Sequence, residues 1–371
     1  MRKRSFICLV LFCSLSLAAY AGSGELRILH INDFHGFADG YAAPGAKTAL
    51  GGIAYLAGTM DHLKKQKPAL FLSAGDMVQG DNWANLFKGE SVIQLMNLMK
   101  LDASALGNHE FDFGQVVLRQ RIAEANFPFL AANVIGVAGI KSSIIKQVGG
   151  VKVGIIGIST LDTPISTSPK NVIGLAFLSP EAVVQRYVDQ LRSKVDVIVV
   201  LSHSGFSVEK ALAEKVKGID VIVGGHSHTK VEKPATVGKT VIVQAWEHAK
   251  ALGVLDLTVK DGKVVKVEGR LVEIRPSLDG DNREVAVLVA KFRDKVNKVL
   301  SQVIAKTTVD LDGLRAHIRA GETNLGDLVA DIIRRTAGAD IAMINSGIIR
   351  TSIRQGNIKI GSNSFYDFCI V

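Results

Sequence analysis

Short apolar runs alternate with segments of helical periodicity along most of this chain, and this alternation restricts the folds that it can adopt. Runs typical of buried strands occupy residues 26–31, 69–73, 103–106, 129–133, 151–158, 195–201 and 219–223. Most of these runs are separated by helical segments near residues 52–66, 90–99, 114–125, 180–193 and 207–217. Strands that alternate with helices predict an α/β fold whose helices cover the faces of a sheet.

Two turn sequences modify this prediction. Gly149-Gly150 separates two apolar runs, and Asp261-Gly262 separates two more. Both pairs are typical of β-hairpins, in which neighbouring strands run antiparallel. We therefore expect a mixed sheet, or two sheets packed together. The expected hairpin strands are residues 144–148, 151–158, 255–260 and 264–274.

The character of the chain changes after Arg275-Pro276. Asp281 followed by Glu284 is typical of a capping box, and apolar residues then recur at helical spacing up to Val303. We expect a long amphipathic helix that leads to a second domain. The 371 residues are enough for two domains. The predicted units are a first domain at 22–276, a linker helix at 277–305 and a second domain at 306–371.

The first residues are typical of a secretory signal peptide. A basic segment at 2–4 precedes an apolar run at 6–18 and the small-residue cleavage sequence Ala19-Tyr20-Ala21. We therefore predict a signal peptide at residues 1–21, a secreted or periplasmic protein, and no stable membrane anchor after cleavage. An uncleaved anchor is the alternative, although the run is short for a membrane span. Cys369 would be the single cysteine of the mature chain, which we expect to be a monomer without an intramolecular disulfide.

The composition is that of an ordinary globular protein, with 47% hydrophobic and 21% charged residues. The formal net charge is +9, and the predicted signal peptide contributes three of the cations. The sequence contains no Lys/Arg-rich run with interleaved aromatic residues. We therefore exclude nucleic acid as a partner and expect the charge to favour solubility and small anions.

Polar clusters follow the ends of five predicted strands. They are Asp33-Phe34-His35, Gly75-Asp76, Asn108-His109, His203 and Gly225-His226-Ser227-His228. Ligands of open α/β sheets bind at the carboxyl ends of strands, so we expect these loops to converge. In extended backbone, the spacing of Asp-x-His and His-x-His would also send both side chains to one face. Carboxylates, imidazoles and an amide oxygen suit zinc or manganese, and their number favours two ions over one.

The order of these clusters resembles that of the calcineurin-like metallophosphoesterases. The resemblance is carried by Ile28-Leu29-His30-Ile31-Asn32-Asp33-Phe34-His35-Gly36, Gly75-Asp76-Met77-Val78-Gln79-Gly80, Gly107-Asn108-His109-Glu110, the His203 loop and Gly225-His226-Ser227-His228. More closely, the chain resembles the secreted 5′-nucleotidase family, which includes UDP-sugar hydrolases. The resemblance implies an αββα double-sheet sandwich followed by an α+β C-terminal domain. It also implies a secreted, dimetal phosphohydrolase that cleaves nucleotide phosphate esters or pyrophosphate bonds.

The resemblance also implies a role for each site residue. Asp33, His35 and His228 would hold one metal ion, Asn108, His203 and His226 the other, and Asp76 would bridge them. A metal-activated hydroxide would attack the phosphorus atom. His109 would stabilise the developing charge of the phosphate or protonate the leaving oxygen, and Asp112 would orient its ring. Asn108 and His109 would contact the substrate. We expect Glu110 to anchor its loop.

The other histidines and tryptophans are predicted to have structural or surface positions. We expect His30 in the core or behind the site, and Trp83 and Trp246 in packing positions. We expect His62, His248 and His317 at the surface.

The second domain resembles only part of its family counterpart. Residues 322–328 and 345–350 resemble two of its motifs, and Arg350 and Arg354 are candidate phosphate contacts. Ile348 is bulkier than the small residue usual there, and residues 364–371 lack the family's continuation. We therefore expect a truncated domain that is partly disordered or exposes its core. Alternatives to the nucleotidase hypothesis are an inactive remnant that only binds metal, a 2′,3′-cyclic-nucleotide phosphodiesterase, and an enzyme acting on a sulfur ester.

Overall fold

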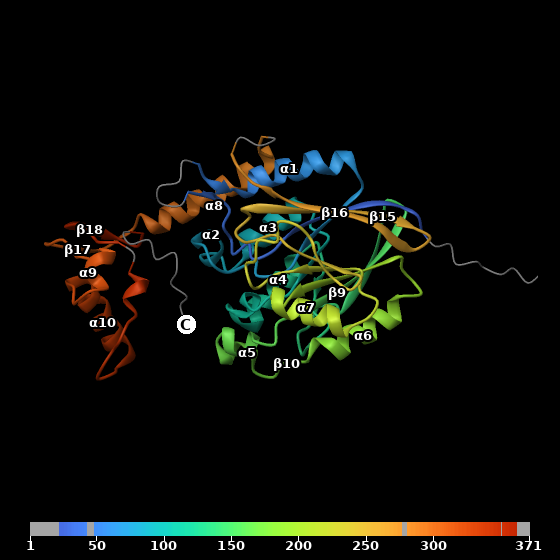
Figure 1. Cartoon of the computed structure of the whole chain (residues 1–371). Coiled ribbons are helices and arrows are strands. Elements are labelled where there is room, and N and C mark those ends of the chain that lie inside the picture. The colour runs from blue at the N-terminus through green and yellow to red at the C-terminus, as the bar shows by residue number, and fades with distance from the viewer. Residues whose placement is uncertain (1–21, 43–47, 277–279, 350, 362–371) are drawn as a thin grey trace, which may run out of the picture.

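Figure 1 presents the computed structural model, which describes residues 22–42, 48–276, 280–349 and 351–361. Three sequence predictions therefore lie outside the described residues. They are the signal peptide at 1–21, the phosphate contact at Arg350, and the C-terminal residues 362–371. Within the described part of the chain, no helix combines the length and the apolar character that a membrane crossing requires.

The main body contains two six-stranded mixed sheets. The first has the order β16-β15-β1-β4-β5-β6, and the second has the order β13-β14-β12-β11-β9-β8. The first comprises β1 (Gly24–Ile31), β4 (Ala69–Ser73), β5 (Ala103–Ala105), β6 (Phe129–Leu130), β15 (Ala251–Lys260) and β16 (Lys263–Glu273). The second comprises β8 (Ser143–Val148), β9 (Val151–Ser159), β11 (Val197–His203), β12 (Val221–Gly224), β13 (Ala235–Val237) and β14 (Thr240–Gln244). Both predicted hairpins are confirmed, as β8–β9 and β15–β16.

The sheets pack face to face, and helices cover their outer faces (Figure 1). In strand β1, alternate residues pack against the second sheet and against the covering helices. Leu26 and Ile28 pack against the second sheet, while Leu29 and Ile31 pack toward the helices, because alternate residues of a strand face opposite sides. The covering helices are α1 (Ile53–Gln66), α3 (Glu90–Leu98) and α4 (Gly114–Glu124) on the first sheet, and α6 (Pro180–Leu191) and α7 (Phe206–Lys215) on the second. The expected αββα sandwich is therefore confirmed.

Shorter elements form the connections of the main body. They are β2 (Gly40–Tyr41), β3 (Leu50–Gly51), α2 (Asn82–Asn85), β7 (Val134–Ile135), α5 (Thr163–Ser166) and β10 (Ala176–Phe177), with 3₁₀ turns η1 (His109–Phe111) and η2 (Pro169–Val172).

Helix α8 (Arg283–Leu300) packs on the helical layer of the first sheet. Its buried face consists of Val285, Val289, Phe292 and Val296. The Phe292 ring meets the Trp83 and Phe87 rings edge-on, and Trp83 Nε1 donates a hydrogen bond to the Val289 carbonyl. The predicted helix is confirmed over residues 283–300, but its predicted end and cap are wrong, because Val303 begins the strand that follows. The Asn282 side chain accepts from the Val285 amide and caps the helix in place of Asp281.

A smaller unit follows α8 and lies beyond one end of it (Figure 1). It contains β17 (Val303–Thr307), α9 (Arg315–Ile318), α10 (Asn324–Ala337), the 3₁₀ turn η3 (Ser346–Ile348) and β18 (Gly356–Lys359). Its buried apolar cluster is small and consists of Leu311, Ile318, Leu325, Ile349 and Ile353. Apolar side chains outside this cluster are exposed, including Ile341 at 78% and Met343 at 91%. Within the described residues, this unit therefore buries few apolar side chains, and the prediction of a truncated domain stays a prediction.

The packing of α8 predicts the effect of two matched substitutions. Phe292→Ala removes a buried ring from contact with two other rings, and we expect it to lower the free energy of unfolding by about 3–5 kcal/mol. Val287→Ala on the same helix should change it by less than about 0.5 kcal/mol, because Val287 is 64% exposed. Urea unfolding of both variants beside the wild type measures the difference. Equal midpoints for the two variants would contradict the packing of α8 on the main body.

Candidate metal centre

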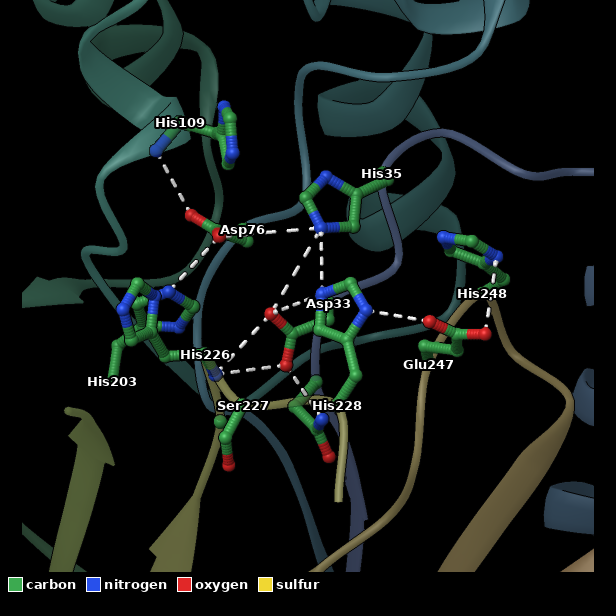
Figure 2. A network of polar contacts seen from close by, with 12 residues as sticks. Asp33, His35, Asp76, His109, His203, His226, Ser227, His228, Glu247 and His248 are labelled. Atoms are coloured by element: carbon green, nitrogen blue, oxygen red, sulfur yellow. Dashed lines mark hydrogen bonds and ion pairs between the residues drawn. The ribbon is translucent and has the colours of Figure 1, made fainter. Parts of the chain in front are cut away.

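The predicted metal ligands gather where strands of the two sheets end (Figure 2). Asp33 and His35 follow β1, Asp76 follows β4, and Asn108 follows β5 of the first sheet. From the second sheet, His203 ends β11, and His226 and His228 follow β12. The expected convergence of the five loops is therefore observed, and both sheets contribute side chains to the cluster.

The turns that carry the ligands do not have the extended backbone assumed for Asp-x-His and His-x-His, so that explanation of the convergence is wrong. Asp33, His35, Asp76, His226 and His228 have φ values between 49° and 74°. These residues are in the left-handed region, which non-glycine residues adopt rarely and with strain, so period-2 alternation does not apply. The turns direct these side chains into the space between the sheet edges. Such strain persists only where the surrounding structure enforces it, and it is concentrated at functional sites.

Asp33, His35 and His228 form the first ligand group. Their ligand atoms lie within 4.8 Å of one another. His228 Nε2 is 3.2 Å from Asp33 Oδ1 and 3.3 Å from His35 Nε2. The Asp33 carboxylate is buried, and it accepts hydrogen bonds from the His226 amide and the Asn32 side chain.

Asp76, Asn108, His203 and His226 form the second ligand group. His203 Nε2 is 3.0 Å from Asp76 Oδ2 and 3.3 Å from Asn108 Oδ1. Asp76, His203 and His226 also offer ligand atoms within 4.8 Å of one another. Asp76 Oδ2 lies 4.0 Å from His35 Nε2, so this carboxylate stands between the two groups.

In three histidines of the cluster, a hydrogen bond at Nδ1 orients the ring so that Nε2 is available for metal coordination. His35 Nδ1 donates to the Gln79 carbonyl at 2.7 Å, and His203 Nδ1 donates to the Ala74 carbonyl at 2.6 Å. His228 Nδ1 donates to the Glu247 carboxylate at 2.5 Å. Each bond leaves Nε2 facing the shared space, as in histidines that bind metals. Imidazoles, carboxylates and an amide oxygen so arranged fit borderline divalent cations.

The electrostatics of the cluster are dominated by burial and by the carboxylates. Burial opposes the charged form of His203 and His228, but the neighbouring carboxylates outweigh it and raise the pKa of each ring to about 10. The charge of Asp76 acts on His203, and the hydrogen bonds that His228 donates to Asp33 and Glu247 act on His228. Burial opposes ionisation of Asp76 as well, but the adjacent imidazoles hold its pKa well below its usual range.

His109 and Asp112 form a hydrogen-bonded pair beside the two ligand groups. His109 Nδ1 donates to Asp112 Oδ2 at 2.6 Å, and its ring centroid lies 5.1 Å from that of His35. Thr167 donates to the other Asp112 carboxylate oxygen at 2.7 Å. Burial disfavours the charged ring, but the hydrogen bond that the ring donates to Asp112 and the charge of Asp76 raise the pKa of His109 to about 9. Thr167, which the sequence prediction missed, therefore fixes the carboxylate that orients the ring.

Glu110 fastens two of the ligand loops together, as predicted. Its buried carboxylate accepts the amides of Asp76 at 3.0 Å, Met77 at 2.7 Å and Gly107 at 2.6 Å. A Cβ atom at Gly107 would overlap Asp76 Oδ1, so this position requires glycine. The loops after β4 and β5 are therefore held in contact by one side chain.

Glu247 and His248 border the cluster, although the sequence analysis did not assign either residue to it. The surface prediction for His248 is wrong. Its ring is half-buried, stacks on Phe37 with centroids 3.8 Å apart, and lies 5.7 Å from the His35 ring. Both residues follow the end of β14, the same position relative to a strand as the other clusters. This position is the sequence signal that could have identified them.

The remaining predicted residues are away from the cluster or behind it. His62 and His317 are exposed, and His30 is buried within β1, as predicted. Trp83 is buried in the packing of α8, and Trp246 is half-buried beside two lysines. Arg354 is 86% exposed and forms an ion pair with Asp310 in the smaller unit, so its contact with substrate stays a prediction.

Comparison with known proteins agrees with this architecture. The profile of the calcineurin-like phosphoesterases matches residues 26–230, and that of the 5′-nucleotidase C-terminal domain matches residues 303–363. The snake venom 5′-nucleotidase of Crotalus adamanteus is 36% identical over 87% of this chain and 60% of its own length. The human 5′-nucleotidase is 32% identical over 91% of this chain and 66% of its own length.

Solved structures give the same result. A 5′-nucleotidase precursor from Thermus thermophilus superposes with a TM-score of 0.73 at 33% identity, covering 91% of this chain and 72% of that one. The fold and the two-sheet cluster define a calcineurin-like phosphoesterase, and within that class the chain belongs to the 5′-nucleotidase family. The chain spans about 60% of the length of the venom relative that it matches.

The three bonds of Glu110 predict a large effect of its removal. Glu110→Ala leaves three buried amides without an acceptor, each of which costs about 1–3 kcal/mol. We expect the free energy of unfolding of the metal-stripped protein to fall by roughly 3 kcal/mol or more. Glu214→Ala, at an exposed position on α7, should leave it within about 0.5 kcal/mol of the wild type. Similar thermal unfolding of the two variants would exclude the anchoring role of Glu110.

Proposed function

We propose that this chain is a secreted phosphohydrolase that uses two divalent metal ions to cleave nucleotide phosphate esters or pyrophosphate bonds. The observation that carries the proposal is the convergence of three Nε2 atoms and two carboxylates beside the hydrogen-bonded His109–Asp112 pair. Family membership and the names of the relatives support a nucleotide as the substrate class. The predicted signal peptide supports secretion.

The metal ligands are proposed as two sets that share one residue. Asp33, His35 and His228 would hold one ion, and Asn108, His203 and His226 the other, with Asp76 between them. Zinc, manganese or a similar ion suits these ligands. When bound, such ions activate water and stabilise the charge on the oxygens of a transferring phosphoryl group.

His109 is the proposed proton donor to the leaving oxygen. Asp112 occupies its Nδ1, so Nε2 is the nitrogen left for the substrate. With a pKa raised to about 9, the ring carries a proton at neutral pH. A positioned imidazolium of this kind contributes to catalysis by protonating the leaving group in the transition state. Asn108 is the second proposed substrate contact. It directly precedes the turn that begins at His109, and its Oδ1 lies 3.3 Å from His203 Nε2.

Substitution of the pair tests this assignment. His109→Ala should lower turnover of an aryl phosphate and of AMP by about a hundredfold or more, with both ions still bound. Asp112→Asn removes a carboxylate that raises the His109 pKa, so the fall in rate at high pH should begin at lower pH than in the wild type. Rate profiles with Mn²⁺ and metal analysis check both expectations. Wild-type turnover by His109→Ala would refute the role of His109, and bound ions without hydrolysis of any nucleotide would identify a metal-binding protein instead.

Metal binding should depend on pH in a direction set by His203 and His228. Both rings have a pKa of about 10 in the metal-free protein and are therefore protonated at pH 7. A metal ion binds only the neutral ring, so binding must release protons and should tighten as pH rises from about 6.5 to 8.5. Calorimetric titration of metal-stripped protein with Mn²⁺, in buffers of different ionisation enthalpy, measures the protons released. A pH-independent affinity without proton release would contradict the assignment of these ligands.

A further inference from the structure

The loop after β14 encloses one side of the cluster. The loop comprises residues 245–250. Three of its residues have left-handed backbone, with φ values of 67° at Trp246, 54° at His248 and 53° at Ala249. The loop is fastened to both neighbouring ligand loops. The His248 amide donates to the Asp33 carbonyl at 2.8 Å, and the Trp246 amide donates to the Thr229 carbonyl at 3.3 Å. This strained conformation is therefore maintained by contacts with the loops that carry Asp33 and His228.

The Glu247 carboxylate connects two cationic partners at this place. Oε2 accepts from His228 Nδ1 at 2.5 Å, and Oε1 accepts from Lys250 Nζ at 2.6 Å. Figure 2 shows Glu247 on the outer side of the His228 ring, with Asp33 and His35 on its inner side. The side chain of Glu247 is 19% exposed, so water screens these bonds only partly.

His228 depends on this carboxylate more than His35 and His203 depend on their partners. His35 and His203 donate Nδ1 to main-chain carbonyls, and their side chains are 9% and 0% exposed. The His228 side chain is 35% exposed, so packing restricts its rotation less. Its ring orientation and its tautomer therefore rest on a bond to another side chain.

We propose that Glu247 is a positioning residue that holds His228 for metal binding, and that Lys250 in turn holds Glu247. The inference rests on the proposed function, in which His228 is a metal ligand. A carboxylate that accepts from the outer nitrogen of a ligating histidine fixes the tautomer and increases the basicity of the inner nitrogen. Glu247 and Lys250 thus support the first ligand group without reaching the metal-binding space themselves.

The same contacts argue against a separate ion bound by Glu247 itself. His228, Glu247 and His248 offer ligand atoms within 4.8 Å of one another. The Lys250 ammonium, however, already occupies Glu247 Oε1 and would repel a cation there. The other carboxylate oxygen, Oε2, already accepts a hydrogen bond from His228 Nδ1. Positioning is therefore the role that these contacts support.

The test compares Mn²⁺ binding by metal-stripped wild type, Glu247→Ala, Glu247→Gln and Glu273→Gln. Glu273 is the matched control, because its half-buried carboxylate also pairs with cations, Lys230 and Arg275, but belongs to none of the candidate ligand groups. We expect Glu247→Ala to bind one of two ions about 10–100-fold more weakly, with the other ion unaffected. Glu247→Gln should retain more affinity than the alanine variant, because its amide oxygen still accepts from Nδ1. Glu273→Gln should bind both ions as the wild type does.

Two readouts keep the test independent of activity. Calorimetry gives the affinity for each ion, and ¹⁵N spectra of labelled histidine in the Zn²⁺-loaded protein report the tautomer of the neutral His228 ring, which should become mixed in Glu247→Ala. Wild-type affinity for both ions and an unchanged His228 tautomer in that variant would overturn the inference while leaving the proposed function intact. If the wild type bound no ions, the proposed function and the inference would fail together.

Discussion

The packing of the two sheets against each other is the contact on which the site depends. Each ligand group takes residues from both sheets. Asp33 and His35 of the first sheet meet His228 of the second, and Asn108 of the first meets His203 and His226 of the second. Neither sheet alone carries a complete group. The apolar layer between the sheets, to which β1 contributes Leu26 and Ile28, therefore sets the distances between the ligand atoms.

Within that frame, hydrogen bonds at the outer side of each ring decide how the ligands point. Main-chain carbonyls hold His35 and His203, and a carboxylate holds His228. Glu110 fastens the loops after β4 and β5, and the loop after β14 fastens those that carry Asp33 and His228. These supports stabilise left-handed turns that short polar loops would not adopt alone. These supports thereby fix the directions in which the candidate ligand atoms point.

Much of the fold could be predicted because it follows from local patterns. Apolar runs such as the one that forms β11 identify buried strands, and Gly149-Gly150 identifies a hairpin. The convergence of most candidate metal ligands could be predicted for the same reason, since these residues lie directly after those runs. The capping of α8 by Asn282 was missed because adjacent polar residues are equivalent in sequence, and only the path of the backbone distinguishes them. The half-buried position of His248 was missed because its ring stacks on Phe37, which is distant in the sequence.

The sequence by itself determined the α/β class, the order of the strands and helices, and the residue types available at each strand end, while the αββα sandwich was implied by the family resemblance. Periodicity and strand-end position are local properties, so the chain displays them without its fold. The tertiary structure decided which nitrogen of each ring faces the cluster, which turns are left-handed, and that Thr167 and Glu247 support Asp112 and His228. These features depend on contacts between loops far apart in sequence, and distances between such loops exist only once the two sheets have packed.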